Sequence, residues 1–168
     1  MNKKSVHQFD VQKMNGESMS LREFDNKVLL IVNTATDCGF TPQLKELESL
    51  RRDFAGEDFE ILAFPSNDFG GQEPREGNAI LEYCVLNYDV HFPIFDKTRV
   101  RGNYAHPLFK FLSDKKLNGH VAAAPRWNFH KYLINRQGEV IDFFYPFTKP
   151  NSSKLRKRIL HQLKQEII

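Results

Sequence analysis

Two cysteines, Cys38 and Cys84, are the side chains of this sequence best suited to redox chemistry. Cys38 lies in the segment NTATDCGFTPQ, which follows the apolar run VLLIV. Thr41 suits the N-cap of a helix and Pro42 its first position, so Cys38 falls in a loop between a strand and a helix. The partial positive charge at a helix N-terminus favours thiolate over thiol. This context favours a reactive Cys38 over the alternative, a small apolar side chain packed against the sheet.

Cys84 has a different setting. It lies in EYCVLNYDVHFP, on the apolar side of a predicted helix from about Ala79 to Asn87. That position is typical of an inert core residue. The predicted helix is short, however, and a short helix is marginal and can unwind locally. The residues alone leave Cys84 open as either a core side chain or a second reactive thiol.

Other kinds of chemistry find little support in the residue pattern. Two cysteines cannot complete a four-ligand zinc site, and the six histidines lack the spacing of a metal motif. Ser66 has no GxSxG context, and Gly70 and Gly71 lack the lysine of a phosphate-binding loop. We expect no metal site and no bound cofactor.

Length and composition predict one globular domain spanning residues 1–168. Hydrophobic residues make up 40% of the chain and include 15 Phe, which excludes disordered and fibrous classes. The formal net charge of +3 is too small to indicate a nucleic-acid partner. The N-terminal segment has no apolar leader, and no stretch has the length of a membrane span. We expect a cytoplasmic protein without stable membrane association.

A β-α-β unit is predicted to position Cys38. Its first strand, Val28 to Val32, is apolar throughout and is typical of a central strand covered on both faces. A second strand, Phe59 to Phe64, completes the unit, in which the two strands run parallel. The helix between them carries a core stripe of Leu44, Leu47 and Leu50. A weak strand at residues 6–13 precedes this unit.

The second half of the chain predicts an edge segment, a helix and a hairpin. Pro93 confines the short strand HFPIF to an edge or a bend, and a helix is expected from Pro107 to Leu112. Strands at about Trp127–Asn135 and Glu139–Phe144 flank a turn and form an antiparallel hairpin.

A last helix begins after a cap at Ser152 or Ser153 and has apolar residues at every fourth position: Leu155, Ile159, Leu163 and Ile167. The order β-α-β, then hairpin, then helix predicts the fold class. We expect an α/β thioredoxin-like fold with a central mixed β-sheet flanked by helices.

Three segments carry a family resemblance: NTATDCGFTPQ, AFPSNDFGGQEP and WNFHKYLINRQG. They resemble the signature segments of the glutathione peroxidases, in a version with cysteine instead of selenocysteine. Weaker matches in NYDVHFPIFDK, AHPLFKFL and FTKP extend the resemblance over nearly the whole chain in the same order. The resemblance implies an oxidoreductase, a peroxidase of oxidative stress defence.

The resemblance also assigns the site. It makes Cys38 the peroxidatic cysteine, with Gln72, Trp127 and Asn128 completing the catalytic tetrad. Amide and indole N–H groups can donate to a thiolate without adding a titrating group, and they can stabilise charge as the O–O bond breaks. Neighbouring strand residues point to opposite faces, so Trp127 and Asn128 can both face one sulfur only if the strand is just beginning there.

The same resemblance makes Cys84 the resolving cysteine, as in the thioredoxin-dependent branch of the family. The expected reductant is thioredoxin, with glutathione as the alternative, and the substrate is hydrogen peroxide or an organic hydroperoxide. Two cysteines whose Cα atoms lie beyond about 7 Å cannot bridge without backbone movement, so we expect movement in residues 79–90. The chain lacks the insertion before Trp127 that oligomeric relatives carry, which favours a monomer.

Three positions depart from the common family pattern. Ser66 stands where a third cysteine often occurs, which leaves Cys84 as the only resolving candidate. Asp68 replaces a common Gln, and Asp37 replaces a residue that is often Lys. An acidic group beside Cys38 would oppose thiolate formation, an effect that Lys45 could offset.

Two other functions stay open at this stage. The first is a non-catalytic redox sensor that relays oxidation to a partner on the same fold. The second is a thiol–disulfide oxidoreductase, but that function needs a close cysteine pair such as CxxC, which the chain lacks.

Overall fold

The computed structural model of the protein describes residues 4–165. Its centre is a four-stranded sheet in the order β4-β3-β5-β6. The strands are β3 (Val28–Thr34), β4 (Phe59–Pro65), β5 (Lys131–Ile134) and β6 (Val140–Phe144). β3 pairs in parallel with β4 and antiparallel with β5, so the sheet is mixed.

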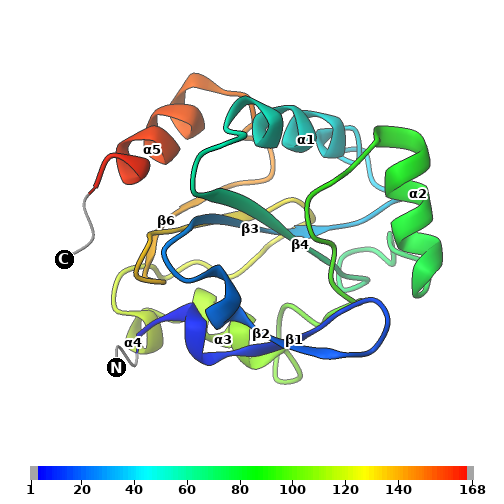
Figure 1. Cartoon of the computed structure of the whole chain (residues 1–168). Coiled ribbons are helices and arrows are strands. Elements are labelled where there is room, and N and C mark those ends of the chain that lie inside the picture. Colours follow the sequence, from blue (N-terminus) through cyan, green and yellow to red (C-terminus); the bar gives the residue numbers. More distant parts are fainter. Residues whose placement is uncertain (1–3, 166–168) are drawn as a thin grey trace.

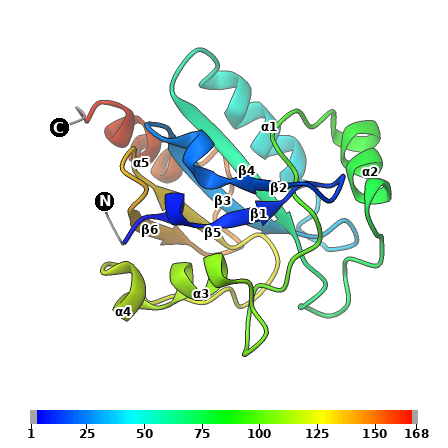
Figure 2. The same ribbon diagram turned by 60° about the horizontal axis from the view of Figure 1, so that its bottom comes forward.

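Helices cover both faces of this sheet (Figure 1). One face carries α1 (Gln43–Asp53) and α5 (Ser153–Leu163), with α2 (Asn78–Tyr88) beside α1. Figure 2 shows the opposite face, which carries the β1–β2 hairpin, α3 (Pro107–Ser113) and α4 (Lys115–Asn118). The hairpin strands are β1 (Asp10–Gln12) and β2 (Ser18–Ser20), and two 3-10 turns, Val6–Gln8 and Leu21–Phe24, flank them.

Every residue of β3 is buried, because both faces of the central strand are covered. Leu30 and Val32 pack into the core under α1 and α5, whereas Leu29 and Ile31 pack into the core under α3. Successive strand side chains alternate between the two faces, so one apolar run supplies both cores. Because β3 is packed on both faces, its C-terminal end, from which the loop carrying Cys38 begins, is held in a fixed position.

Much of the predicted architecture is confirmed. β3 and β4 run parallel, and the hydroxyl of Ser152 caps α5 by accepting from the Leu155 N–H at 3.3 Å. The short strand predicted at HFPIF does not form, because Ile94 and Phe95 make only isolated bridges, to Ala63 and Lys13. Ile167, predicted to extend the stripe of α5, lies outside the described residues.

Several predicted element boundaries are wrong. α1 begins at Gln43 and not at Pro42, and Thr41 is not its cap. β5 begins at Lys131 instead of Trp127, and only Asp10–Gln12 of the strand predicted at 6–13 forms. None of the helices within residues 4–165 combines the length and apolar character of a membrane-crossing segment.

Candidate active site

Cys38 sits in a tight turn between β3 and α1. The Thr41 hydroxyl accepts from the Cys38 N–H at 2.9 Å and donates to the Ala35 carbonyl at 2.8 Å. These two bonds explain why Thr41 does not cap the helix. The Cys38 Sγ in turn accepts from the Phe40 N–H at 3.3 Å. The donor at the sulfur is therefore a backbone amide of the turn and not one from the first turn of α1.

A second loop, residues 66–77, is bound to the Cys38 turn. The Asp37 N–H donates to the Gln72 carbonyl at 3.0 Å, which joins the neighbour of Cys38 to Gln72. Both oxygens of the Glu73 carboxylate accept from Thr36, one from its N–H at 3.2 Å and one from its hydroxyl at 2.6 Å. The segment that carries Gln72 is thus held directly against the segment that carries Cys38.

The Trp127–Asn128 segment completes this end of the sheet. The Asn128 Nδ2 donates to the Gln72 Oε1 at 3.1 Å. The Trp127 ring packs beside Phe69, with 5.8 Å between the ring centroids. It also lies over Gly70, since a Cβ added there would approach the Trp127 Cη2 to 3.1 Å. The structure therefore gathers the Cys38 turn, Gln72, Trp127 and Asn128 at one end of β3.

The backbone before β5 explains how the adjacent residues Trp127 and Asn128 can both lie at the end of β3 that leads into the Cys38 turn. Asn33 of β3 donates from its side chain to the Trp127 carbonyl at 3.0 Å and accepts from the Phe129 N–H at 2.6 Å. Phe129 has a φ of 69°, in the left-handed region, so the chain turns before the strand begins. Trp127 and Asn128 therefore precede the strand, and the alternation of strand side chains does not apply to them. The sequence required this if both residues were to face one sulfur.

Two buried charged residues beside the site are absent from the sequence-based assignment. Lys131 is fully buried, and its Nζ donates to the Phe129 carbonyl at 2.8 Å and the Pro146 carbonyl at 3.3 Å. Burial lowers the pKa of Lys131 to about 7. Glu73 is also fully buried, and burial raises the pKa of its carboxyl. Two sequence features could have pointed to these residues: a lysine inside the apolar run FHKYLI, and an acidic residue directly after Gln72.

Cys84 lies on the inner side of α2, in the core formed with α1. Its side chain is 2% exposed. Burial, with a smaller contribution from the charge of Glu73, raises the pKa of Cys84 to about 12, while Arg75 acts in the opposite direction. At neutral pH Cys84 is therefore a protonated thiol. Both cysteines are free in the structure.

A cleft of about 430 Å³ adjoins the Cys38 turn. Its lining includes Gly39 and Phe40 of the turn, Lys45 of α1, and Phe147 and Lys149 after β6. Cys38 itself does not line this cleft, whose walls combine aromatic and basic side chains with the acidic Glu46.

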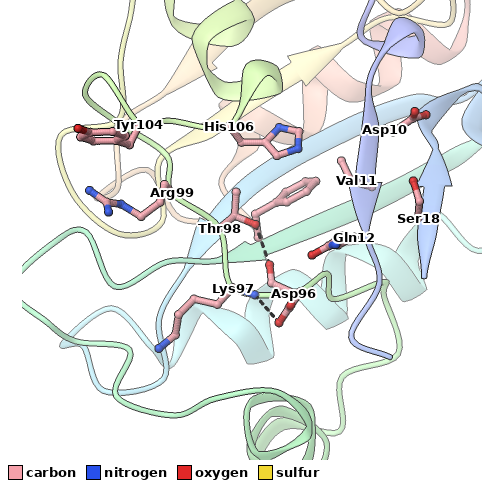
Figure 3. A pocket seen from close by; sticks show the side chains of 11 residues that line it. Asp10, Val11, Gln12, Ser18, Asp96, Lys97, Thr98, Arg99, Tyr104 and His106 are labelled. Carbon is pink, nitrogen blue, oxygen red and sulfur yellow. Dashed lines mark hydrogen bonds between the residues drawn. The ribbon is translucent and has the colours of Figure 1, made fainter. Parts of the chain in front are cut away.

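A different cleft of about 400 Å³ lies between β1, β2 and the segment 96–106 (Figure 3). No cysteine lines it. Phe64 lines it and belongs to the core on the face opposite the one on which Cys38 packs. This cleft is thus separate from the thiol, and residues 4–165 hold no cluster of three or more His, Cys, Asp or Glu arranged to bind a metal.

The two acidic departures lie in different environments. Asp68 accepts from the Val100 N–H at 2.7 Å and pairs with Arg99 at 2.7 Å, so its carboxylate is bound to residues 99–100. Asp37 is exposed, and its backbone N–H rather than its side chain forms the bond to Gln72.

The fold and this site define a thioredoxin-like α/β protein with a cysteine held in the loop between the inner strand β3 and α1. The glutathione peroxidase family profile matches residues 6–113. The chain is 47% identical over 150 residues to "Glutathione peroxidase homolog BsaA" of Staphylococcus epidermidis, which covers 89% of this chain and 94% of that protein.

It is 41% identical over 148 residues to "Glutathione peroxidase-like peroxiredoxin 2" of Saccharomyces cerevisiae, over 88% of this chain and 91% of that one. The crystal structure of Trgpx in its apo form aligns with a TM-score of 0.76 at 36% identity, covering 96% of each chain. The chain therefore belongs to the glutathione peroxidase family and is a thiol peroxidase. The predicted family, fold class and enzyme class are confirmed.

Proposed function

We propose that the protein reduces hydrogen peroxide or organic hydroperoxides at Cys38, resolves the product through Cys84 and is recycled by thioredoxin. The observation that carries this proposal is the hydrogen bonding that joins the Cys38 turn to Gln72 and Gln72 to Asn128. These residues come from three separate segments of the chain, and the two hydrogen bonds join those segments beside the turn that holds the half-buried Cys38.

In the first step the Cys38 thiolate attacks one peroxide oxygen, the O–O bond breaks, and water or an alcohol leaves after protonation. Cys38 becomes a sulfenic acid. The Phe40 N–H already points at the sulfur. Donors from Gln72, Asn128 and the Trp127 indole supply preorganised dipoles for the charge that develops on the leaving oxygen.

In the second step the Cys84 thiol attacks the Cys38 sulfur, water leaves, and a disulfide forms. Cys84 is buried on the inner side of the folded α2, so we expect the helix to open before this attack. Residues 78–88 bury only Ile80 and Cys84, and the N-cap position, Gly77, provides no side-chain cap. A helix with so few buried contacts can open locally, which would solvate Cys84 and restore an ordinary thiol.

Thioredoxin fits the last step because a protein dithiol reduces an intramolecular disulfide by exchange, with two electrons moving to the Cys38–Cys84 pair. A yeast relative bears the name peroxiredoxin, which supports a thiol-based cycle. Glutathione is the alternative reductant. We further propose a monomeric, single-domain protein of the cytoplasm, a location in keeping with the bacterial relatives.

Intact mass after one equivalent of hydrogen peroxide tests this scheme in the wild type, Cys84→Ser and Cys38→Ser. We expect the wild type to lose about 2 Da as a disulfide, Cys84→Ser to gain about 16 Da as a sulfenic acid, and Cys38→Ser to stay unchanged. An oxygen adduct on the wild type would remove the resolving role of Cys84. Oxidation of Cys38→Ser as fast as the wild type would remove Cys38 from the reaction.

Steady-state turnover with excess thioredoxin, its reductase and NADPH then separates an enzyme cycle from a relay. A peroxidase consumes NADPH continuously, whereas a relay stops after one equivalent and accumulates a mixed disulfide with its partner. Replacing thioredoxin by glutathione in the same assay identifies the reductant.

A further inference from the structure

Arg75 joins the two parts of the molecule that must separate if Cys84 is to reach Cys38. Its guanidinium donates to the Thr36 hydroxyl at 2.8 Å. The same group stacks over the Tyr83 ring, with 4.1 Å from its central carbon to the ring centroid. Thr36 lies two positions before Cys38, and Tyr83 directly precedes Cys84. One side chain therefore contacts the segment of each cysteine.

We propose that Arg75 is a latch, a positioning residue that holds α2 closed against the Cys38 segment and thereby sets the rate of disulfide formation. The inference rests on the proposed function, because it concerns the step in which Cys84 attacks oxidised Cys38. Opening of α2 requires the link from Thr36 through Arg75 to Tyr83 to break.

The anchor side of the latch is rigid. Thr36 is buried, and its N–H and hydroxyl both bind the fully buried Glu73 carboxylate. The Glu73 N–H in turn donates to the Asn67 side chain at 2.9 Å. Because Thr36 is fixed in this way, α2 can move outward only when the link from Thr36 through Arg75 to Tyr83 breaks.

The C-terminal end of α2 is held more weakly. Arg52 donates to the Asp89 carboxylate at 2.8 Å, but both side chains are more than half exposed, at 55% and 69%. Exposed ion pairs contribute little to stability, since water and salt screen them. A cation stacked on an aromatic ring is worth more where it is partly desolvated, and both Arg75 and Tyr83 are half-buried.

The latch can be removed without changing any charge. Tyr83→Leu removes the ring and keeps Arg75, and Tyr83→Phe keeps the ring as a matched control. This choice matters because Arg75 also lowers the pKa of Cys84, so that replacing Arg75 itself would change two properties at once.

The test follows one turnover by quenched intact mass and by the fluorescence of Trp127, the single Trp of the chain. We expect Tyr83→Leu to convert sulfenic acid to disulfide about fivefold faster than the wild type, as loss of a partly buried cation–π contact implies. Cys38 oxidation should keep the wild-type rate in both variants, and Tyr83→Phe should form the disulfide at the wild-type rate. Amide exchange in α2 should accelerate only in Tyr83→Leu.

Asp89→Asn provides the control at the C-terminal end of α2, because it removes the exposed carboxylate that pairs with Arg52 and His91 and leaves the latch intact. We expect its disulfide rate to stay within about twofold of the wild type. If Asp89→Asn accelerated disulfide formation as much as Tyr83→Leu does, general loosening of α2 would set the rate, and the latch would be overturned.

A disulfide formed by Tyr83→Leu at the wild-type rate, or more slowly, would overturn the latch and leave the resolving role of Cys84 intact. Absence of the disulfide in the wild type would instead overturn the resolving role itself, and the latch with it. Arg75→Lys supplies a second variant, which keeps the charge but loses the planar stacking group. It should also accelerate disulfide formation, and an unchanged rate there would count against the latch.

Discussion

The turn that holds Cys38 and the helix that holds Cys84 give their cysteine thiols opposite environments. Cys38 is half-buried in a loop, and its sulfur accepts a backbone hydrogen bond at 3.3 Å. Cys84 is 2% exposed among apolar side chains, and burial raises its pKa to about 12. The comparison teaches that backbone context decides the chemistry of a thiol. A turn offers amide donors, whereas the inner face of a helix offers none, because its amides are bonded within the helix.

The two regions also differ in how firmly they are held. The Cys38 turn is tied by Thr41, and Thr36 beside it is bound by Glu73 and Arg75. Residues 78–88 bury only Ile80 and Cys84. A rigid turn suits a group that must meet substrate in one geometry. A loosely packed helix suits a thiol such as Cys84, which must stay unreactive while buried and then move toward Cys38.

Alkylation of the native protein gives the largest expected contrast. At pH 8 a thiol with a pKa of about 12 is ionised in only ~1 molecule in 10,000, so Cys84 should react with iodoacetamide about a thousandfold more slowly than an ordinary thiol of pKa ~8.5. Cys38 should take up the label first, as peptide mapping by mass spectrometry would show. Because the pKa of Cys84 is raised, its rate should climb about tenfold per pH unit up to that pKa.

Denaturation in urea is the control for this contrast. Unfolding removes the burial that raises the pKa, so both cysteines should then react at similar rates. Native labelling of Cys84 as fast as Cys38 would contradict the difference between the two regions.

Asn128→Asp probes the Cys38 side alone and has the next largest expected effect. The substitution replaces the donor to the Gln72 Oε1 by a carboxylate oxygen and places a negative charge in a buried position. A charge there opposes formation of a neighbouring thiolate, and a donor for the leaving oxygen is lost. We expect Cys38 oxidation to slow by about 100-fold, with partial recovery at high pH.

Stopped-flow measurement of Cys38 oxidation over a pH series checks this prediction. The later conversion of sulfenic acid to disulfide should proceed at nearly the wild-type rate, because α2 is untouched. A change of less than threefold in the first step would place Asn128 outside the reaction.

The fold was accessible from the sequence wherever local pattern and tertiary contacts agree. The run VLLIV and the Ser152 cap are examples, since burial and capping act locally. The start of β5 was not accessible. WNFHKYLIN has the composition of a strand, but bonds from Asn33 hold Trp127 and Phe129 in a turn. Nothing local marks Phe129 for a positive φ.

The residues of the candidate site likewise divide into those that the sequence predicted and those that it did not. Motif resemblance pointed to Cys38, Gln72, Trp127 and Asn128, whereas Glu73 and Arg75 were missed. The importance of these two residues comes from contacts with Thr36, which is remote in the sequence. Charged residues in a glycine-bearing loop are usually solvated, so their types alone do not indicate burial.

Gly70→Ala and Gly102→Ala form a matched pair that tests whether the Cys38 site depends on the exact place of Trp127. Both glycines have positive φ, 66° and 79°, so each alanine should cost about 1 kcal/mol of stability in urea unfolding. Only the Cβ at position 70 meets the Trp127 ring, at 3.1 Å, whereas nothing lies within 4 Å at position 102. A shift of a few tenths of an ångström in Trp127 should slow Cys38 oxidation by about tenfold in Gly70→Ala, with little change in Gly102→Ala. Equal rates in the two variants would mean that the indole contributes packing, and that the donors to the Cys38 reaction come from the turn, Gln72 and Asn128 without it.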